Sequence, residues 1–310
     1  MTPRLRNLVR IARDSNGARG EALRVWFFRL AGRVTPMLGV EHAGLRLVVS
    51  TGETAGVGFY TFVHGGYEEQ TIERLLAALE RRLGLSSLRG LTVLEVGSNI
   101  GTETVSMLGR HGAARVVAIE PDPDNARFLR ANLALNGLEG RAKVLELALS
   151  DVDAKLRLER SPDNWGDHRI RVASPTGPSL SVEHERTTVE VPARTLDSLI
   201  EAGDVDVGTL DLVWMDVQGH EAHVLAGAER LVDAGIPIVT EYWPYGLNRV
   251  GALERFHRLV VERHDEILDL RPNQPGPPAV IAARDVAVLA DRYPRDEFAA
   301  STDLLLVPRG

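Results

Sequence analysis

The chain has 310 residues, of which 44% are hydrophobic and 25% are charged, as is usual for a globular protein with a sizeable core. It contains no cysteine, which excludes disulfides, thiolate zinc sites and cysteine nucleophiles. The formal net charge of -7 argues against nonspecific binding to nucleic acid, and we expect no nucleic-acid partner.

Residues 1–64 predict an N-terminal extension made of a helix and short strands. An apolar cluster from Val25 to Leu30 lies beside arginines and favours a helix docked on the main domain. An interfacial membrane helix or a dimer helix is the alternative, so a homo-oligomer stays open. Strands broken by glycines are expected within 46–63. We expect a cytoplasmic protein without a secretory signal or a transmembrane segment, because no long apolar run is present.

From residue 65 to residue 310, short apolar strands alternate with helices. Leucines at helical spacing predict a helix that ends near Gly84, and further helices are expected at 102–111, 123–136 and 250–264. The expected strands cover residues 92–96, 116–119, 144–149, 210–215, 236–240, 266–270 and 304–307. Apolar strands joined by helices indicate an α/β fold with a doubly wound, mostly parallel sheet.

Residues 151–195 interrupt this alternation. They are polar, with a stretch rich in proline, glycine and serine at 174–181, and predict an inserted segment of strands and loops. Trp165 stands among polar residues of this segment, which suits stacking on a sugar or another flat substrate; a structural anchor is the alternative. His168 is a candidate base or substrate ligand. Thr195 is expected to cap a short helix.

A glycine turn follows the strand at 92–96 and precedes a helix. Gly97 and Gly101 allow the backbone to approach a ligand closely at the carboxyl end of a strand. Their spacing differs from the glycine pattern of dinucleotide sites, and no lysine follows as in a phosphate loop. Glu95 would repel a phosphate but attract the ammonium and sulfonium of S-adenosylmethionine. A dinucleotide-dependent oxidoreductase is therefore the weaker interpretation.

Glu120 ends the second apolar strand, 23 residues after Gly97. A carboxylate at that place can accept both hydroxyls of a ribose, which supports nucleoside binding. An ordinary acid at a helix N-terminus, ahead of Pro121, is the alternative. Leu149 ends the third strand and is expected near the adenine.

A second acidic cluster follows two further strands. Asp216, His220, Glu221 and Glu241 are expected to converge at the same edge of the sheet. We predict catalysis by His220, as the base that removes a hydroxyl proton, and by Asp216, with Glu241 on the substrate side. Asp216 and Glu241 could also bind a divalent cation such as Mg²⁺, which would lower the pKa of the hydroxyl.

These motifs together resemble the FkbM family of methyltransferases. The resemblance rests on residues 95–101, 119–121 and 215–221, on Asn132 with Asn136, and on shorter matches at 66–68 and 302–305. It implies a Rossmann-like, class I methyltransferase sheet of seven strands with the last strand antiparallel. It also implies binding of S-adenosylmethionine, with Glu95, Gly97, Asn99 and Glu120 as cofactor residues; Ser98, Gly101, Pro121 and Leu149 complete the expected set.

Two positions depart from the family pattern. Glu95 replaces an aspartate and keeps its charge, whereas Gln218 replaces a glutamate and removes one. The resemblance implies O-methylation of a hydroxyl on a sugar, glycan or natural product, and so a small-molecule or glycan partner. N-methylation of a small amine and a non-catalytic, cofactor-binding scaffold are the alternatives.

Overall fold

The computed structural model describes residues 18–65, 69–172, 175, 186–271 and 276–309. The short match at 66–68, most of the stretch at 174–181 and part of the expected loop at 272–278 lie outside the described residues. Within the described ranges, every helix is too short or too polar to traverse a lipid bilayer.

The main sheet has eight strands in the spatial order β13-β12-β14-β11-β10-β3-β4-β5. Their bounds are β3 Thr92–Val96, β4 Arg115–Ile119, β5 Ala142–Leu145, β10 Leu212–Met215, β11 Ile238–Tyr242, β12 His264–Asp269, β13 Ala279–Ala282 and β14 Thr302–Pro308. Strands β5, β4, β3, β10 and β11 pair in parallel, and β14 is antiparallel to both of its neighbours. The predicted antiparallel last strand is confirmed. The predicted count of seven is wrong, because β13 folds back on β12 as an additional edge strand.

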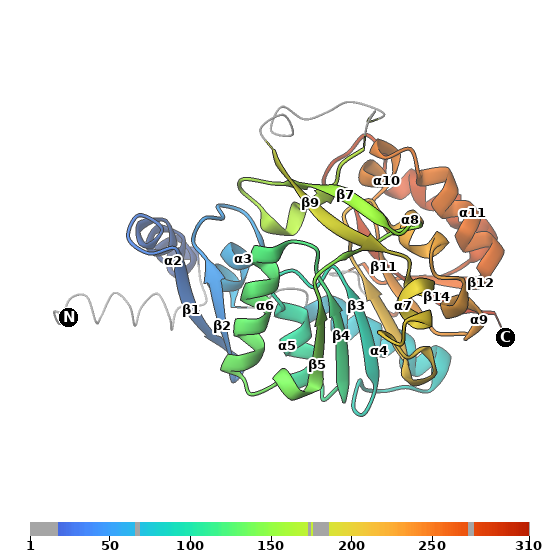
Figure 1. Ribbon diagram of the computed structural model, residues 1–310, viewed down its shortest axis with the longest axis horizontal. Coiled ribbons are helices and arrows are strands. Elements are labelled where there is room, and N and C mark those ends of the chain that lie inside the picture. Colours follow the sequence, from blue (N-terminus) through green and yellow to red (C-terminus); the bar gives the residue numbers. More distant parts are fainter. Residues whose placement is uncertain (1–17, 66–68, 173–174, 176–185, 272–275, 310) are drawn as a thin grey trace.

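Helices cover both faces of the main sheet (Figure 1). Side chains alternate along each strand, so Leu94 and Val96 pack into one core and Val93 into the other. One core includes α7 Leu196–Glu201, α8 Glu221–Ala226, α9 Glu229–Asp233 and α11 Leu253–Arg263. The other includes α4 Glu69–Leu83, α5 Thr102–Gly109 and α6 Pro123–Leu135. The predicted α/β fold with a mostly parallel sheet is therefore confirmed.

Two predicted helix starts are present. The Asp122 side chain accepts hydrogen bonds from the N–H groups of Asp124 and Asn125 at the start of α6. Thr195 caps α7 by accepting from the N–H of Ser198 at 3.0 Å. Two shorter helices, α10 Pro244–Arg249 and α12 Leu289–Arg292, were not expected.

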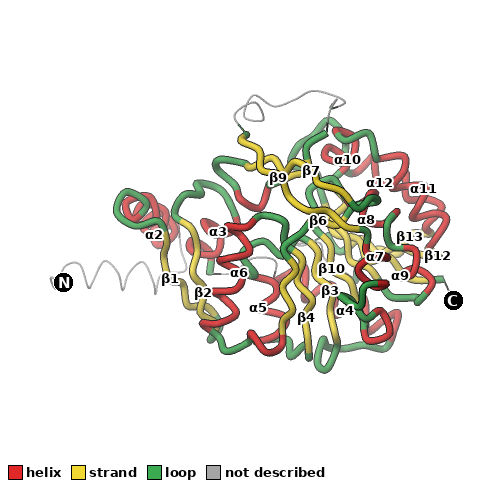
Figure 2. The backbone as a smooth tube through the Cα atoms, in the orientation of Figure 1, coloured by secondary structure: helices red, strands yellow, loops and turns green. Residues whose placement is uncertain are grey.

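The inserted segment builds a second, smaller sheet in the order β6-β9-β7-β8. Its strands are β6 Ala148–Leu149, β7 Ala154–Arg160, β8 Arg169–Ile170 and β9 Thr187–Arg194. The chain leaves the main sheet after Leu145, and β6 pairs with β9 instead, so the single strand expected at 144–149 is wrong. In Figure 2 this sheet lies above the main sheet, at the end where the site described below is found.

The N-terminal part contains α2 Ala18–Ala31, a hairpin of β1 Met37–His42 and β2 Leu45–Ser50, and α3 Val57–His64. The strands expected across 46–63 are wrong beyond residue 50. Although the segment at 57–64 is rich in strand-forming residues, it is helical, because Phe59 and Phe62 both pack on Phe28 with ring centroids 5.3 Å away. Tertiary packing here overrides the local preference for strand.

Two asparagines attach the hairpin to α6. The Asn132 side chain accepts from the N–H of Val48 at 2.6 Å and donates to its carbonyl at 3.1 Å. Asn136 makes the same pair of bonds with Arg46, at 2.9 and 2.6 Å. These contacts hold the hairpin against the main domain, and the division of the chain at residue 65 stays a prediction.

Candidate active site

The glycine turn after β3 is packed directly against the strand end at Asp216. Gly97 has a φ of +89°, and a Cβ at this position would lie 1.8 Å from the carbonyl oxygen of Asp216. The N–H groups of Gly97 and Ser98 both donate to the carbonyl of Ile119, at 2.9 and 3.0 Å. A residue with a side chain cannot occupy position 97 without moving this backbone.

Glu120 lies at the end of β4 with its carboxylate held by backbone. One oxygen accepts from the N–H of Asn99 and the other from the N–H of Asp122, both at 2.8 Å. Burial raises the pKa of Glu120 to about 7, although these bonds and the Asn125 side chain favour its charged form. The oxygen bonded to Asp122 also accepts from Asn125 at 3.5 Å, whereas the oxygen bonded to Asn99 keeps a further lone pair that can accept from a ligand.

A first pocket opens beside this turn. Five of the eight expected cofactor residues line it, namely Gly97, Asn99, Glu120, Pro121 and Leu149. The other three lie elsewhere. Ser98 is buried beneath the turn, Gly101 starts α5 against Leu129, and Glu95 faces a second pocket. Sequence reasoning missed Asn125, which lines the first pocket and contacts Glu120. Its position in the first turn of α6, close to Glu120, was the available signal.

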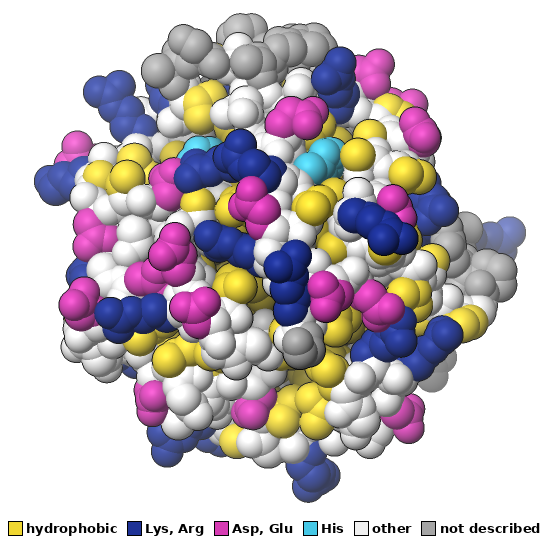
Figure 3. All heavy atoms as spheres, turned by 90° about the vertical axis from the view of Figure 1, so that its right-hand side faces the viewer, with side chains coloured by type: hydrophobic (Ala, Val, Ile, Leu, Met, Phe, Trp, Pro, Cys, Tyr) yellow, Lys and Arg dark blue, Asp and Glu magenta, His cyan; other side chains and the backbone are white. Residues whose placement is uncertain are grey.

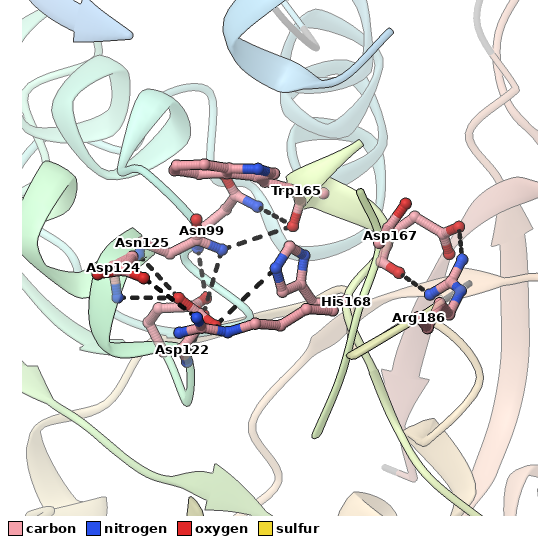
Figure 4. Close-up of polar contacts among 12 residues, drawn as sticks. Asn99, Asp122, Asp124, Asn125, Trp165, Asp167, His168 and Arg186 are labelled. Atoms are coloured by element: carbon pink, nitrogen blue, oxygen red, sulfur yellow. Dashed lines mark hydrogen bonds and ion pairs between the residues drawn. The ribbon is translucent and has the colours of Figure 1, made fainter. Parts of the chain in front are cut away.

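A cover segment, residues 161–170, lies over the first pocket (Figure 4). The Trp165 carbonyl accepts from the side chains of Asn99 at 3.1 Å and Asn125 at 3.5 Å, and its ring meets Phe128 edge-on. His168 lies beside the Asp122 carboxylate, with 3.9 Å between Nε2 and Oδ2, and burial lowers its pKa. The structure therefore places Trp165 and His168 at the first pocket.

His220 also belongs to the wall of the first pocket. Its Nε2 lies 2.9 Å from the hydroxyl of Ser150, and its ring stacks on His223 with centroids 4.3 Å apart. Burial lowers the pKa of His220 to about 3, which makes the imidazole a weak base. Of the four side chains expected to converge, His220 and Asp216 line the first pocket, Asp216 and Glu241 line a second pocket, and Glu221 lies within 4.8 Å of both other acids.

A second pocket adjoins the first and is acidic. Its carboxylates are Glu95, Glu103, Asp167, Asp216 and Glu241, and its aromatic walls are Trp214, Trp243 and Phe298. Among the described lining residues there is no lysine, arginine or histidine. Sequence reasoning missed Trp243 and Phe298, since neither stands in a recognisable motif and only the fold brings them together, with centroids 5.3 Å apart.

Two of these carboxylates differ in how their charge is balanced. Asp167 pairs with Arg169 at 2.5 Å and with Arg186, and Arg169 stacks on Trp243. No arginine, lysine or histidine of the described ranges pairs with Glu95; it accepts from the hydroxyl of Thr104, and burial raises its pKa to about 8. A cationic ligand group near Glu95 would favour its charged form.

Asp216 and Glu241 are bridged by the side chain of Gln218. Its Nε2 donates to Asp216 Oδ1 at 2.7 Å and to Glu241 Oε2 at 3.1 Å. Burial raises the pKa of Asp216. Carboxylate oxygens of Asp216, Glu221 and Glu241 lie within 4.8 Å of one another, so the donor set of a cation site is present, with the amide bonded to two of its members.

The sequence profile of the FkbM methyltransferase domain matches residues 95–272. A 2-O-methyltransferase, NoeI, of Sinorhizobium fredii is 28% identical over 159 residues, covering 48% of this chain and 62% of that protein. A homologue of tRNA wybutosine-synthesizing protein 2 from Danio rerio is 26% identical over 179 residues, which cover 54% of this chain and 43% of that protein. The chain thus spans less than two thirds of either relative.

Among solved structures, one of an FkbM methyltransferase from Methylobacillus flagellatus is similar to this chain, with 15% identity and a TM-score of 0.42. The alignment covers 97% of this chain and 58% of that chain. The profile match covers more than half of the chain and includes the glycine turn, Glu120, Asp216 and Glu241. The resemblance drawn from these motifs is confirmed: the chain belongs to the FkbM methyltransferase domain family.

Proposed function

We propose that this chain is an S-adenosylmethionine-dependent O-methyltransferase. One observation carries the proposal: the two pockets share a wall made of Gly97, Asn99, Gly166, Asp216 and Gln218. A nucleoside in the first pocket and an acceptor in the second would therefore meet at this wall, which is what transfer between two bound molecules requires.

The first pocket fits the cofactor. Glu120 would accept from the ribose hydroxyls, and Leu149 would lie against the adenine. Glu95, which lines the second pocket, would face the positively charged methionine end, and that charge would favour the ionised form of its carboxyl group. When bound, S-adenosylmethionine supplies a methyl group attached to a positively charged sulfur. Transfer of the methyl group leaves that sulfur as a neutral thioether. Trp165 and His168, expected on the substrate side, are assigned here to the cover of this pocket.

The second pocket fits a hydroxyl acceptor. Asp216 lies in the shared wall, and its raised pKa brings the carboxylate closer to the basicity that proton removal at neutral pH requires. We therefore propose that Asp216, rather than His220, removes the proton from the acceptor hydroxyl. Glu241, which also lines the second pocket, would accept hydrogen bonds from hydroxyls of the acceptor.

The acceptor class follows from the walls of the second pocket. Trp243 and Phe298 offer apolar ring faces, and the carboxylates offer hydrogen-bond acceptors, the combination that suits a sugar ring. The named activity of the relative NoeI, a 2-O-methyltransferase, favours transfer to oxygen. A sugar, glycan or glycosylated natural product is the proposed substrate.

A nucleic-acid substrate, suggested by the name of the second relative, is less favoured. In the described part of the face shown in Figure 3, arginines and lysines are interspersed with acidic side chains and form no continuous basic surface. The net charge of -7 and the acidic second pocket would likewise repel a phosphate backbone.

Calorimetric titration of the protein with S-adenosylmethionine, S-adenosylhomocysteine and NAD tests the cofactor. We expect micromolar binding of the two adenosyl compounds and none of NAD. Glu120→Ala removes a hydrogen bond to a charged group and should weaken binding by about 1.5–3 kcal/mol. Glu139→Ala, an exposed acid of the same charge, is the matched control. Unchanged affinity in Glu120→Ala would remove Glu120 from the site; a panel of glycosides then tests methyl acceptance.

A further inference from the structure

The turn that carries Gln218 has an unusual backbone. Gln218 has a φ of +54° and Gly219 a φ of +97°. Glycine adopts this region readily, but a residue with a side chain rarely does so unless its surroundings impose it. Here Glu221 imposes it, because one carboxylate oxygen accepts from the N–H groups of Val217 and Gly219, both at 3.1 Å.

This backbone sends the Gln218 side chain between two acids. The amide nitrogen has two protons, and it donates to Asp216 at 2.7 Å and to Glu241 at 3.1 Å. The opposite orientation of the amide would direct its oxygen at two carboxylates, which is repulsive. The nitrogen is therefore the end that faces the acids.

Two or three carboxylates this close normally need a compensating charge. Oxygens of Asp216, Glu221 and Glu241 lie within 4.8 Å of one another, and carboxylates at such spacing are the ligands that divalent cations take. Gln218 supplies two N–H dipoles at the same place.

We propose that the Gln218 amide takes the place of a divalent cation, holding Asp216 and Glu241 together in the acceptor pocket without a metal. Gln218 is thus a positioning residue, acting through the two carboxylates that it bridges. The role of the pocket in methyl transfer rests on the proposed function, whereas the bridge itself does not. The earlier expectation of Mg²⁺ at Asp216 and Glu241 is replaced by this assignment.

Manganese(II) alone is the probe, because its electron paramagnetic resonance signal reports the free ion. The wild-type protein should bind no Mn²⁺ tightly, since the ion must displace the amide. Gln218→Ala removes the amide from both carboxylates, and Gln218→Glu puts a further carboxylate in its place, so both variants should bind Mn²⁺ at least tenfold more tightly. Glu190→Gln, at an exposed ion pair with Lys155, should match the wild type.

Two further variants locate the bound ion. Adding Glu241→Gln to Gln218→Glu should abolish the gained affinity, and retained binding of S-adenosylhomocysteine shows that each variant is folded. Stoichiometric Mn²⁺ binding by the wild type that Glu241→Gln removes would overturn the proposal. So would Gln218 variants that are folded and gain no affinity. Neither titration uses a methyl donor or acceptor, so failure here is distinct from failure of the proposed methyl transfer.

Discussion

The two pockets are walled by different kinds of group. In the first, backbone N–H groups hold the Glu120 carboxylate, Asp216 lies in the wall shared with the second pocket, and the remaining wall is largely apolar, with Leu149, Leu158 and Ile170 among its members. In the second, five carboxylates and three aromatic rings come from segments far apart in the chain. A short local motif thus positions the Glu120 carboxylate, whereas the whole fold brings together the side chains of the second pocket.

The difference suits the two proposed ligands. A cofactor is the same molecule in every turnover, so a rigid turn that fits it closely is an advantage. An acceptor pocket made of side chains can change its specificity by substitution without disturbing the turn. Gln218, which stands in the shared wall, is one such side chain.

The largest expected effect comes from the backbone of the first pocket. Gly97→Ala places a Cβ 1.8 Å from the Asp216 carbonyl oxygen at a φ of +89°. We expect a loss of about 3–5 kcal/mol in the free energy of unfolding, from overpacking and from the left-handed conformation. Denaturant unfolding measures it. Gly140→Ala, with open space around its Cβ, is the control; equal stability of the two variants would contradict the close packing.

Removing the proposed base from the second pocket should abolish most of the turnover. Asp216→Asn keeps the shape and the hydrogen-bonding capacity of the side chain but cannot take a proton. We expect turnover to fall by about 10²–10⁴-fold with S-adenosylhomocysteine affinity within about threefold of wild type. Release of S-adenosylhomocysteine in the presence of an accepted glycoside measures turnover. If Glu241→Gln loses activity and Asp216→Asn retains it, the proton goes to Glu241 instead.

A variant of His220 tests whether this side chain serves cofactor binding or proton removal. As part of the first pocket, with a pKa of about 3, it should contribute to cofactor affinity and little to proton removal. His220→Ala should therefore weaken S-adenosylhomocysteine binding by about tenfold, the value of one hydrogen bond, with turnover at saturating cofactor unchanged. The opposite result, normal binding with lost turnover, would restore His220 as the base.

The first pocket could be predicted from the sequence to a greater extent than the second. Gly97, Asn99, Glu120 and Leu149 stand at strand ends, and the order of strands in a doubly wound sheet brings such ends together. The expected meeting of Asp216 with Glu241 has the same origin. The position of His220 could not be predicted in this way. A shift of one residue along the turn changes which pocket a side chain faces, and no pattern of hydrophobicity specifies that direction.

The remaining errors also concern tertiary packing. The segment at 57–64 has the composition of a strand and becomes a helix through contacts with Phe28, about 30 residues earlier. The chain at 144–149 is apolar throughout, and no local signal marks where it passes from the main sheet to the second sheet. Trp243 and Phe298 come together only in the folded chain.

The smallest expected effect is a dependence of the free energy of unfolding on pH, which comes from buried acids in and beside the two pockets. Burial raises the pKa of Glu95 to about 8 and of Glu120 and Glu221 to about 7. Above pH 4.5 the unfolded chain releases protons that the folded protein keeps, so the free protein loses stability as the pH rises toward 8. The lowered pKa of His220 acts in the opposite sense, but only below pH 6.5.

Thermal unfolding of the free protein between pH 6.5 and 8.5 therefore isolates the buried acids. We expect the Tm to fall by a few degrees across this interval. Glu95→Gln, which stays neutral, should fall less, because it removes the group with the highest of these pKa values. Glu190→Gln, at an exposed acid, should follow the wild type. Parallel curves for Glu95→Gln and wild type would mean that the Glu95 carboxylate is already ionised in the free protein, and that its charge is compensated before any cofactor binds.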